Sequence, residues 1–164
     1  MLDTNILLTA TDEGRAGHER ALDVINGWPA HGTTLYTSGQ IIREYLSVAT
    51  RPATQNGLGL TVPDALDNAR AFRSRMLLLA EDAKVANQLA ELLEETKSSG
   101  KQVHDANVVA TMLVHGVDTV VTLNTGDFAR FGQHVHVSGL PGQELGHERA
   151  PGAESKSAPN RHLQ

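Results

Sequence analysis

The sequence predicts one α/β domain with a mostly parallel central sheet that is flanked by helices on both faces. Short apolar or β-branched runs alternate along the chain with segments whose apolar residues recur at helical spacing. Strands that alternate with helices pair in parallel and are covered on both faces. The chain has 164 residues, enough for one domain with a core and too few for two ordinary domains.

Four helices are expected in the first half of the chain. Apolar residues recur at helical spacing after His18 and again after Ser38, a residue type that caps helices well. Pro29 is expected to stop the second helix, and Pro63 suits the first turn of the fourth. These helices are expected at residues 5–10, 18–28, 39–50 and 64–74, with a β-prone run at 34–37 and a glycine-containing loop at 55–61.

Two further helices and three strands are expected in the second half. Asp82 is suited to cap a helix that Gly100 stops, and Gly116 is suited to end the next helix. The apolar run at residues 76–79 and the β-branched run at residues 119–123 both have the length of a strand. The helices are expected at residues 82–98 and 104–115, and a weaker strand at residues 135–137.

Composition sets limits on domain organisation and on function. Residues 1–140 form the predicted domain, and residues 141–164, rich in proline and glycine, are expected to be a disordered tail. The chain has no cysteine, which excludes disulfides, thiolate zinc sites and cysteine nucleophiles. No apolar run approaches the roughly 18 residues that span a bilayer, and a signal-peptide pattern is missing, so we expect a cytoplasmic protein without membrane contact. Fourteen Lys and Arg against nineteen Asp and Glu give a net charge of −5, which counts only weakly against a nucleic-acid partner because bound metal would neutralise some acids.

Four acidic residues, Asp3, Glu44, Asp105 and Asp127, lie where a carboxylate has no obvious structural use. Asp105 is on the apolar stripe of its helix, and Glu44 borders the apolar face of another. Asp3 and Asp127 follow predicted strands, and ligands of parallel sheets bind beyond the carboxyl ends of the strands. Each acid also has an ordinary explanation: helix capping for Asp3 and Asp105, a solvated helix flank for Glu44, and a turn for Asp127.

Four segments together resemble the PIN-domain ribonucleases, and specifically the VapC-type toxins of bacterial toxin–antitoxin pairs. The segments are Leu2-Asp3-Thr4-Asn5, Ile42-Arg43-Glu44, Gln102-Val103-His104-Asp105-Ala106 and residues 122–131. The resemblance implies a Rossmann-like PIN domain with a Mg²⁺ or Mn²⁺ site. It places the acidic positions of the family, both metal-binding and catalytic, at Asp3, Glu44, Asp105 and Asp127.

The sequence departs from the family pattern at two places. Only Met1 and Leu2 precede Asp3, so the first strand is either truncated or unusually short. The last acid of the family can fall at the position of Asn124 or of Asp127, and here only Asp127 is acidic. Asn124 could still bind a metal through its carbonyl oxygen or orient a water molecule.

The chemistry implied is hydrolysis of RNA by a metal-activated water, which leaves 5′-phosphate and 3′-hydroxyl ends. An all-oxygen set of ligands suits Mg²⁺, which keeps several waters. Asp3 and Asp105 are expected as the main ligands, with Glu44 and Asp127 completing the site or acting through water. The expected supporting groups are Thr4, Asn5, Thr122 and Asn124. The expected contacts with the phosphates of single-stranded RNA are Arg43, Arg51, Lys101 and Arg130.

The toxin interpretation implies two protein partners. One is a cognate antitoxin whose C-terminal segment lies along apolar helices and puts a basic residue among the acids. The other is a second copy of the chain in a homodimer. Two alternatives stay open: a PIN nuclease for RNA maturation, and a non-catalytic PIN module that binds RNA or protein. A phosphatase of the haloacid-dehalogenase kind is excluded, because Asn5 stands where it needs a second Asp, and the histidines are not expected to form a zinc site.

Overall fold

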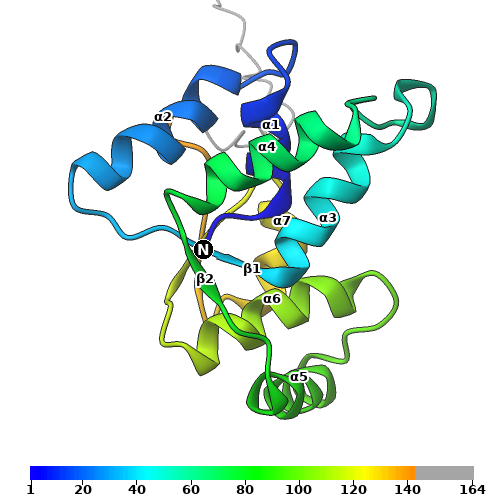
Figure 1. Ribbon diagram of the computed structural model, residues 1–164. Coiled ribbons are helices and arrows are strands. Elements are labelled where there is room, and N and C mark those ends of the chain that lie inside the picture. The colour runs from blue at the N-terminus through cyan, green and yellow to red at the C-terminus, as the bar shows by residue number, and fades with distance from the viewer. Residues whose placement is uncertain (143–164) are drawn as a thin grey trace, which may run out of the picture.

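In the computed structural model, which describes residues 1–142, helices alternate with short strands as expected (Figure 1). The helices are α1 Thr4–Thr11, α2 His18–Ala30, α3 Gly39–Thr50, α4 Val62–Arg73, α5 Ala83–Thr96, α6 Gln102–Val114 and α7 Thr125–Phe128, with 3-10 turns η1 Ala53–Gln55 and η2 Ala129–Phe131. The strands are β1 Tyr36–Ser38, β2 Leu77–Leu79, β3 Thr119–Val121 and β4 His136–Ser138. The predicted tail lies outside the described residues from position 143 onward.

The first three residues hold the two halves of the sheet together. Strand β1 pairs in parallel with β2, and β3 pairs in parallel with β4. Leu2 lies between these pairs: its amide donates to the carbonyl of Tyr36 at 3.0 Å, and it forms a parallel bridge with Val121. The amide of Asp3 then donates to the carbonyl of Val121 at 3.0 Å. The chain therefore leaves the middle of the sheet at Asp3.

Helices cover the strands in two groups. Figure 1 shows α5 and α6 together on one side of the strands and α2 and α4 on the other. Helix α5 packs on α6, while α1 contacts both α2 and α3, and α3 contacts α4. The ring of Tyr45 on α3 meets Phe72 on α4 edge to face, with centroids 5.3 Å apart. The largest fully buried side chains come from both sides of the sheet: Tyr45, Phe128, Phe131, Leu2, Ile6, Leu7, Ile25, Ile41, Leu92 and Met112.

The predicted helix caps are confirmed, and two predicted helix ends are wrong. The side chain of Ser38 accepts from the amide of Ile41 at 3.4 Å, and that of Asp82 accepts from the amide of Lys84 at 2.9 Å. Helix α2 runs past Pro29 to Ala30, because a proline in the last turn removes only one helix bond. Helix α5 ends at Thr96, because Lys97 takes the left-handed conformation (φ 55°) before Gly100 is reached.

Strand β2 is less covered than the sequence predicts. Its side chains at Leu77 and Leu78 are 58% and 47% exposed, and only Leu79 is buried, at 9% exposure. The reason is topological: β2 pairs only with β1 among the strands of residues 1–142, so it forms an edge of the sheet.

Within residues 1–142, no helix combines the length and the apolar character that a membrane crossing requires.

Neighbouring leucines of β2 are expected to differ in their contribution to stability. Leu79→Ala removes a buried side chain and should lower the free energy of unfolding by about 2 kcal/mol. Leu78→Ala removes an exposed one and should change it by about 0.5 kcal/mol or less. Urea unfolding followed by circular dichroism measures both, and an equal loss in the two variants would contradict the assignment of β2 as an exposed edge.

Candidate metal centre

Asp3 is fixed at the carboxyl end of the middle of the sheet. It is the N-cap of α1, and its Oδ1 accepts from the amide of Thr4 at 2.7 Å. Its Oδ2 accepts from the hydroxyl of Thr122 at 2.6 Å and from the amide side chain of Asn5 at 2.8 Å. Burial raises the pKa of Asp3, the hydrogen bonds of its donors oppose that rise, and the charge of Glu44 adds to it.

The side chains of Asn5 and Thr122 connect Asp3 to the end of β3. Asn5 donates to the hydroxyl of Thr122 at 3.0 Å and accepts from the amide of Leu123 at 3.0 Å. The hydroxyl of Thr122 also accepts from the amide of Asn124 at 3.0 Å, so each of its donor and acceptor positions is used. Asn124 thus contributes its backbone amide to this network, while its side chain is exposed.

Glu44 is held by donors from two helices and is not simply a solvated residue. Its Oε2 accepts from the hydroxyl of Thr4 at 3.0 Å, and its Oε1 accepts from the amide side chain of Gln40 at 2.7 Å. The ring of His104 lies 3.6 Å from Oε1, with the histidine side chain 69% exposed and the glutamate 37% exposed. Both carboxylate oxygens are therefore oriented from within the fold.

Asp105 lies in the first turn of α6 and is electrostatically coupled to the other three acids. Burial and, after it, the charges of Asp3, Asp127 and Glu44 together raise the pKa of Asp105 to about 6, against an opposing effect of His104. Asp127 is exposed in the short helix α7, rather than in the turn expected from the sequence. Acids that are up to 124 positions apart in the sequence are thus linked through their effects on Asp105.

The arrangement is an open cup of carboxylates rather than a tight cage. Within residues 1–142, no group of three or more His, Asp or Glu side chains is gathered closely enough to hold an ion among them. Mg²⁺ and Mn²⁺ do not require such a cage, because Mg²⁺ is commonly bound by one or two carboxylates and keeps several waters. The oxygen-only donors, and the negative charge of three acids acting on Asp105, fit a hard divalent cation of this kind.

The four predicted phosphate contacts are exposed, and they differ in their surroundings. Arg43 pairs with Glu81 at 3.3 Å, with the arginine side chain 70% exposed. Arg51 follows the last residue of α3, Lys101 precedes α6, and Arg130 lies in η2. Each of these basic residues therefore lies in, or next to, a helix that carries one of the acids.

Three polar residues near the acids were missed by the sequence analysis: Gln40, Asn107 and Glu81. Gln40 joins Glu44 to α6, and Asn107 donates to Gln40 at 2.6 Å. A carboxylate oxygen of Glu81 accepts from the backbone amide of Gln40 at 2.7 Å. Their roles depend on contacts between elements distant in sequence; the only available signal was the polar Gln40 one turn before Glu44 on the same helix face.

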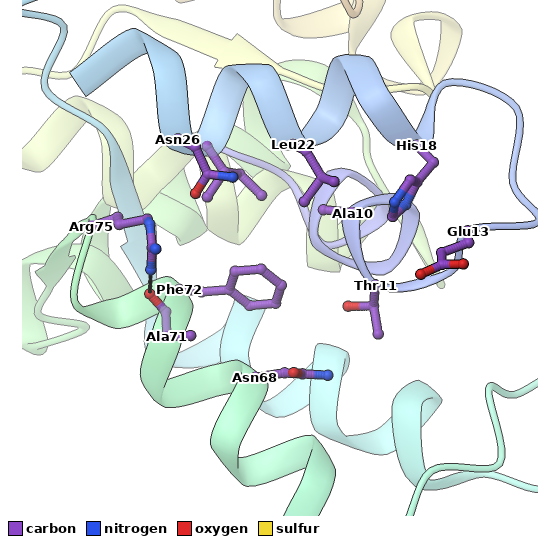
Figure 2. Close-up of a pocket in the computed structure, with 11 residues that line it drawn as sticks. Ala10, Thr11, Glu13, His18, Leu22, Asn26, Asn68, Ala71, Phe72 and Arg75 are labelled. Atoms are coloured by element: carbon purple, nitrogen blue, oxygen red, sulfur yellow. Dashed lines mark hydrogen bonds between the residues drawn. The ribbon is translucent and has the colours of Figure 1, made fainter. Parts of the chain in front are cut away.

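A separate hollow of about 380 Å³ lies away from the four acids, between α1, α2 and α4. Figure 2 shows Phe72 of α4 and Leu22 of α2 pointing into it, with Arg75 and Glu13 at opposite sides. Ala10 and Thr11, at the end of α1, line it as well. Helix α1 therefore begins at the carboxylate cup and ends at this hollow.

The sequence model of the PIN domain family matches residues 1–133. The chain belongs to the PIN domain family. Ribonuclease VapC24 of Mycobacterium tuberculosis is 28% identical over 137 residues, covering 80% of this chain and 90% of that protein. Ribonuclease VapC48 of the same species is 28% identical over 131 residues, covering 79% and 89%. The crystal structure of VapBC2 from Rickettsia felis, bound to a DNA fragment from its promoter, shares the fold of this PIN domain, with a TM-score of 0.62. The sequence identity is 20%, and the match covers 85% of this chain and 96% of that one.

Replacing Asp105 by Asn is expected to stabilise the metal-free PIN domain near neutral pH. The unfolded chain loses this proton near pH 3.8, whereas the folded protein keeps it up to about pH 6. Raising the pH through this window therefore destabilises the folded state. Asp105→Asn should raise the free energy of unfolding by about 1 kcal/mol above pH 6, after allowance for solvent screening, and the gain should vanish below pH 4.

Thermal unfolding in EDTA at a series of pH values measures this difference. Asp67→Asn is the matched control, because Asp67 is an exposed helix residue paired only with Arg70 among the described residues. A gain for Asp105→Asn that is independent of pH, or equal to that of the control, would contradict the electrostatic coupling of the cup.

Proposed function

We propose that this PIN domain is a Mg²⁺- or Mn²⁺-dependent endoribonuclease and the toxin of a toxin–antitoxin pair. The observation that carries the proposal is the coupling of Asp105 to Asp3, Glu44 and Asp127 beyond the carboxyl ends of parallel strands. Two relatives that are named ribonucleases support the activity, since they match about four fifths of the chain. The VapBC2 structure supports a pairing with a second protein.

The acidic residues of the cup would hold the cation in different ways. Asp3 and Asp105 would bind it directly, and Glu44 and Asp127 would complete the site or act through water. A bound divalent ion supplies polarisation of the phosphate and activation of a water. Asn5 and Thr122 keep Asp3 oriented, and hydrolysis by water leaves 5′-phosphate and 3′-hydroxyl ends.

The substrate of the proposal is single-stranded RNA. Unpaired segments can enter a cup between helices, and their phosphates need cations outside it. Arg43, Arg51, Lys101 and Arg130 are the proposed contacts, all exposed and next to the acidic elements. The proposal places the protein in the cytoplasm, where such RNA is abundant.

The proposed antitoxin occupies the hollow between α1, α2 and α4. Phe72 and Leu22 offer an apolar floor, and Arg75 and Glu13 offer charges at its sides (Figure 2). These features suit an amphipathic helix of the partner. Helix α1, which begins at Asp3 and ends at the hollow, has eight residues and is therefore roughly 12 Å long, a span that a few extended residues of the partner can cover. A homodimer remains a prediction from the family resemblance.

Cleavage of structured RNAs that present single-stranded loops tests the activity. We expect cleavage with Mg²⁺ or Mn²⁺, none in EDTA, and a loss of at least about 100-fold for Asp105→Ala, because the site would lack a main metal ligand. Asp23→Ala, which removes an exposed acid on α2, should leave the rate unchanged.

Three outcomes separate the proposal from its alternatives. Wild-type cleavage that survives both EDTA and Asp105→Ala would overturn the metal mechanism. Metal binding without cleavage would favour the non-catalytic module. Cleavage without growth inhibition, and without an adjacent small reading frame that suppresses toxicity, would favour RNA maturation.

Blocking the hollow is expected to release the PIN domain from its antitoxin. Ala71 is exposed on α4 and lines the hollow, so Ala71→Arg should weaken antitoxin binding at least about 10-fold by filling it. Ala86→Arg, on the exposed side of α5, is the matched control. Binding of the product of the adjacent reading frame, measured by calorimetry, is the readout, and unchanged affinity in Ala71→Arg would exclude the hollow as the docking site.

A further inference from the structure

Gln40 is a buried polar residue whose contacts all lead to the carboxylate cup. It lies in the first turn of α3, is 6% exposed, and precedes Glu44 by one helical turn. We propose that Gln40 is a positioning residue of the metal centre: it holds Glu44 for cation binding and ties Glu44 to the helix that carries Asp105. This inference rests on the proposed function and deepens it.

The amide group of Gln40 is almost fully used in one orientation. Its Nε2 donates to Oε1 of Glu44 at 2.7 Å and to the carbonyl of His104 at 3.0 Å. Its Oε1 accepts from the amide side chain of Asn107 at 2.6 Å. The two acceptors near Nε2 and the donor near Oε1 fix which end of the amide faces Glu44. A buried amide with these partners has little freedom to turn away.

Gln40 orients Glu44 without neutralising it. The donors to the carboxylate, Gln40 and Thr4, are both uncharged. Within residues 1–142, the only group that can carry a positive charge and pairs with Glu44 is His104, at 3.6 Å and largely exposed. A lysine or arginine in place of Gln40 would compete with a metal ion for the negative charge, whereas an amide leaves that charge for the cation.

Gln40 also links α3 and α6, the two helices that carry Glu44 and Asp105. The carbonyl of His104, to which it donates, immediately precedes Asp105 in the backbone, and Asn107 lies two residues beyond Asp105. The backbone amide of Gln40 donates in turn to Glu81, two residues after the end of β2. The start of α3 and the first turn of α6 are thus joined through one side chain, on which the spacing of Glu44 and Asp105 depends.

If the role of Gln40 were only structural, replacing it would lower stability and would not change metal binding through Glu44. Mn²⁺ affinity in a double-mutant cycle distinguishes the two roles. Gln40→Met keeps the length of the side chain and removes both donors and the acceptor. We expect it to weaken Mn²⁺ binding about 10-fold in the wild-type background, the usual effect of losing a group that orients a metal ligand. In the Glu44→Ala background, the same change should alter the affinity less than about 2-fold, because the residue through which Gln40 acts is gone.

Calorimetry with Mn²⁺ on the full chain measures all four affinities, and thermal unfolding in EDTA records stability separately. Gln88→Met is the matched control, because Gln88 on α5 also donates to a glutamate of its own helix, at 3.3 Å from Glu91. Its Mn²⁺ affinity should equal that of the wild type. If Gln40→Met does not fold, Asn107→Ala serves instead: it leaves the bond to Glu44, frees the other end of the amide, and should show a smaller loss that also disappears with Glu44→Ala.

The outcomes for the inference and for the proposed function are distinguishable. Wild-type Mn²⁺ binding that Glu44→Ala weakens and Gln40→Met does not would overturn the inference alone. An equal loss from Gln40→Met in both backgrounds would also overturn it, since Gln40 would then act independently of Glu44. Wild-type protein that binds Mn²⁺ no better than Asp105→Ala would overturn the proposed function, and the inference with it.

Discussion

Repulsion among four carboxylates is the constraint around which this PIN domain is arranged. Burial is the largest cause of the raised pKa of Asp105, and the charges of Asp3, Asp127 and Glu44 add to it, so the folded chain concentrates negative charge that the unfolded chain keeps apart. Hydrogen bonds from uncharged donors offset the cost of this charge concentration. Thr4 and Thr122 donate through their hydroxyl groups, and other residues donate through amide groups. These donors orient the acids and leave their charge intact. A site built in this way keeps a negative charge that its hydrogen-bond donors do not neutralise.

The topology makes that concentration possible. Because Leu2 pairs on both sides, the chain leaves the sheet at Asp3 in the middle of its carboxyl edge. The parallel strands β1 and β3 end at the same edge, so the helix with Glu44 and the turn after Thr122 begin there too. Asp105 arrives from the other side through α6, which packs with α5. Short strands are enough to build this site, because they only need to bring the starts of the helices together at this edge.

Much of this could be predicted from local pattern. The alternation of helices and strands, the caps at Ser38 and Asp82, and the acids at unexpected positions follow from spacing and residue type. The support of Asp3 by Asn5 was predictable because both residues belong to one short motif, Leu2-Asp3-Thr4-Asn5. In contrast, the bond from Gln40 to the carbonyl of His104 joins residues 64 positions apart, and no periodicity within α3 indicates it. The exposure of Leu77 was missed for the same reason, since an apolar run does not reveal whether its strand is central or at an edge.

The open side of β2 has a consequence for handling the protein. A strand with unpaired backbone groups and two solvent-facing leucines is a template onto which another extended chain can add. Natural proteins often guard such positions with lysine or proline, and neither occurs at residues 77–79. Concentrated preparations will therefore tend to aggregate through this edge strand, and a single lysine introduced there should keep them in solution.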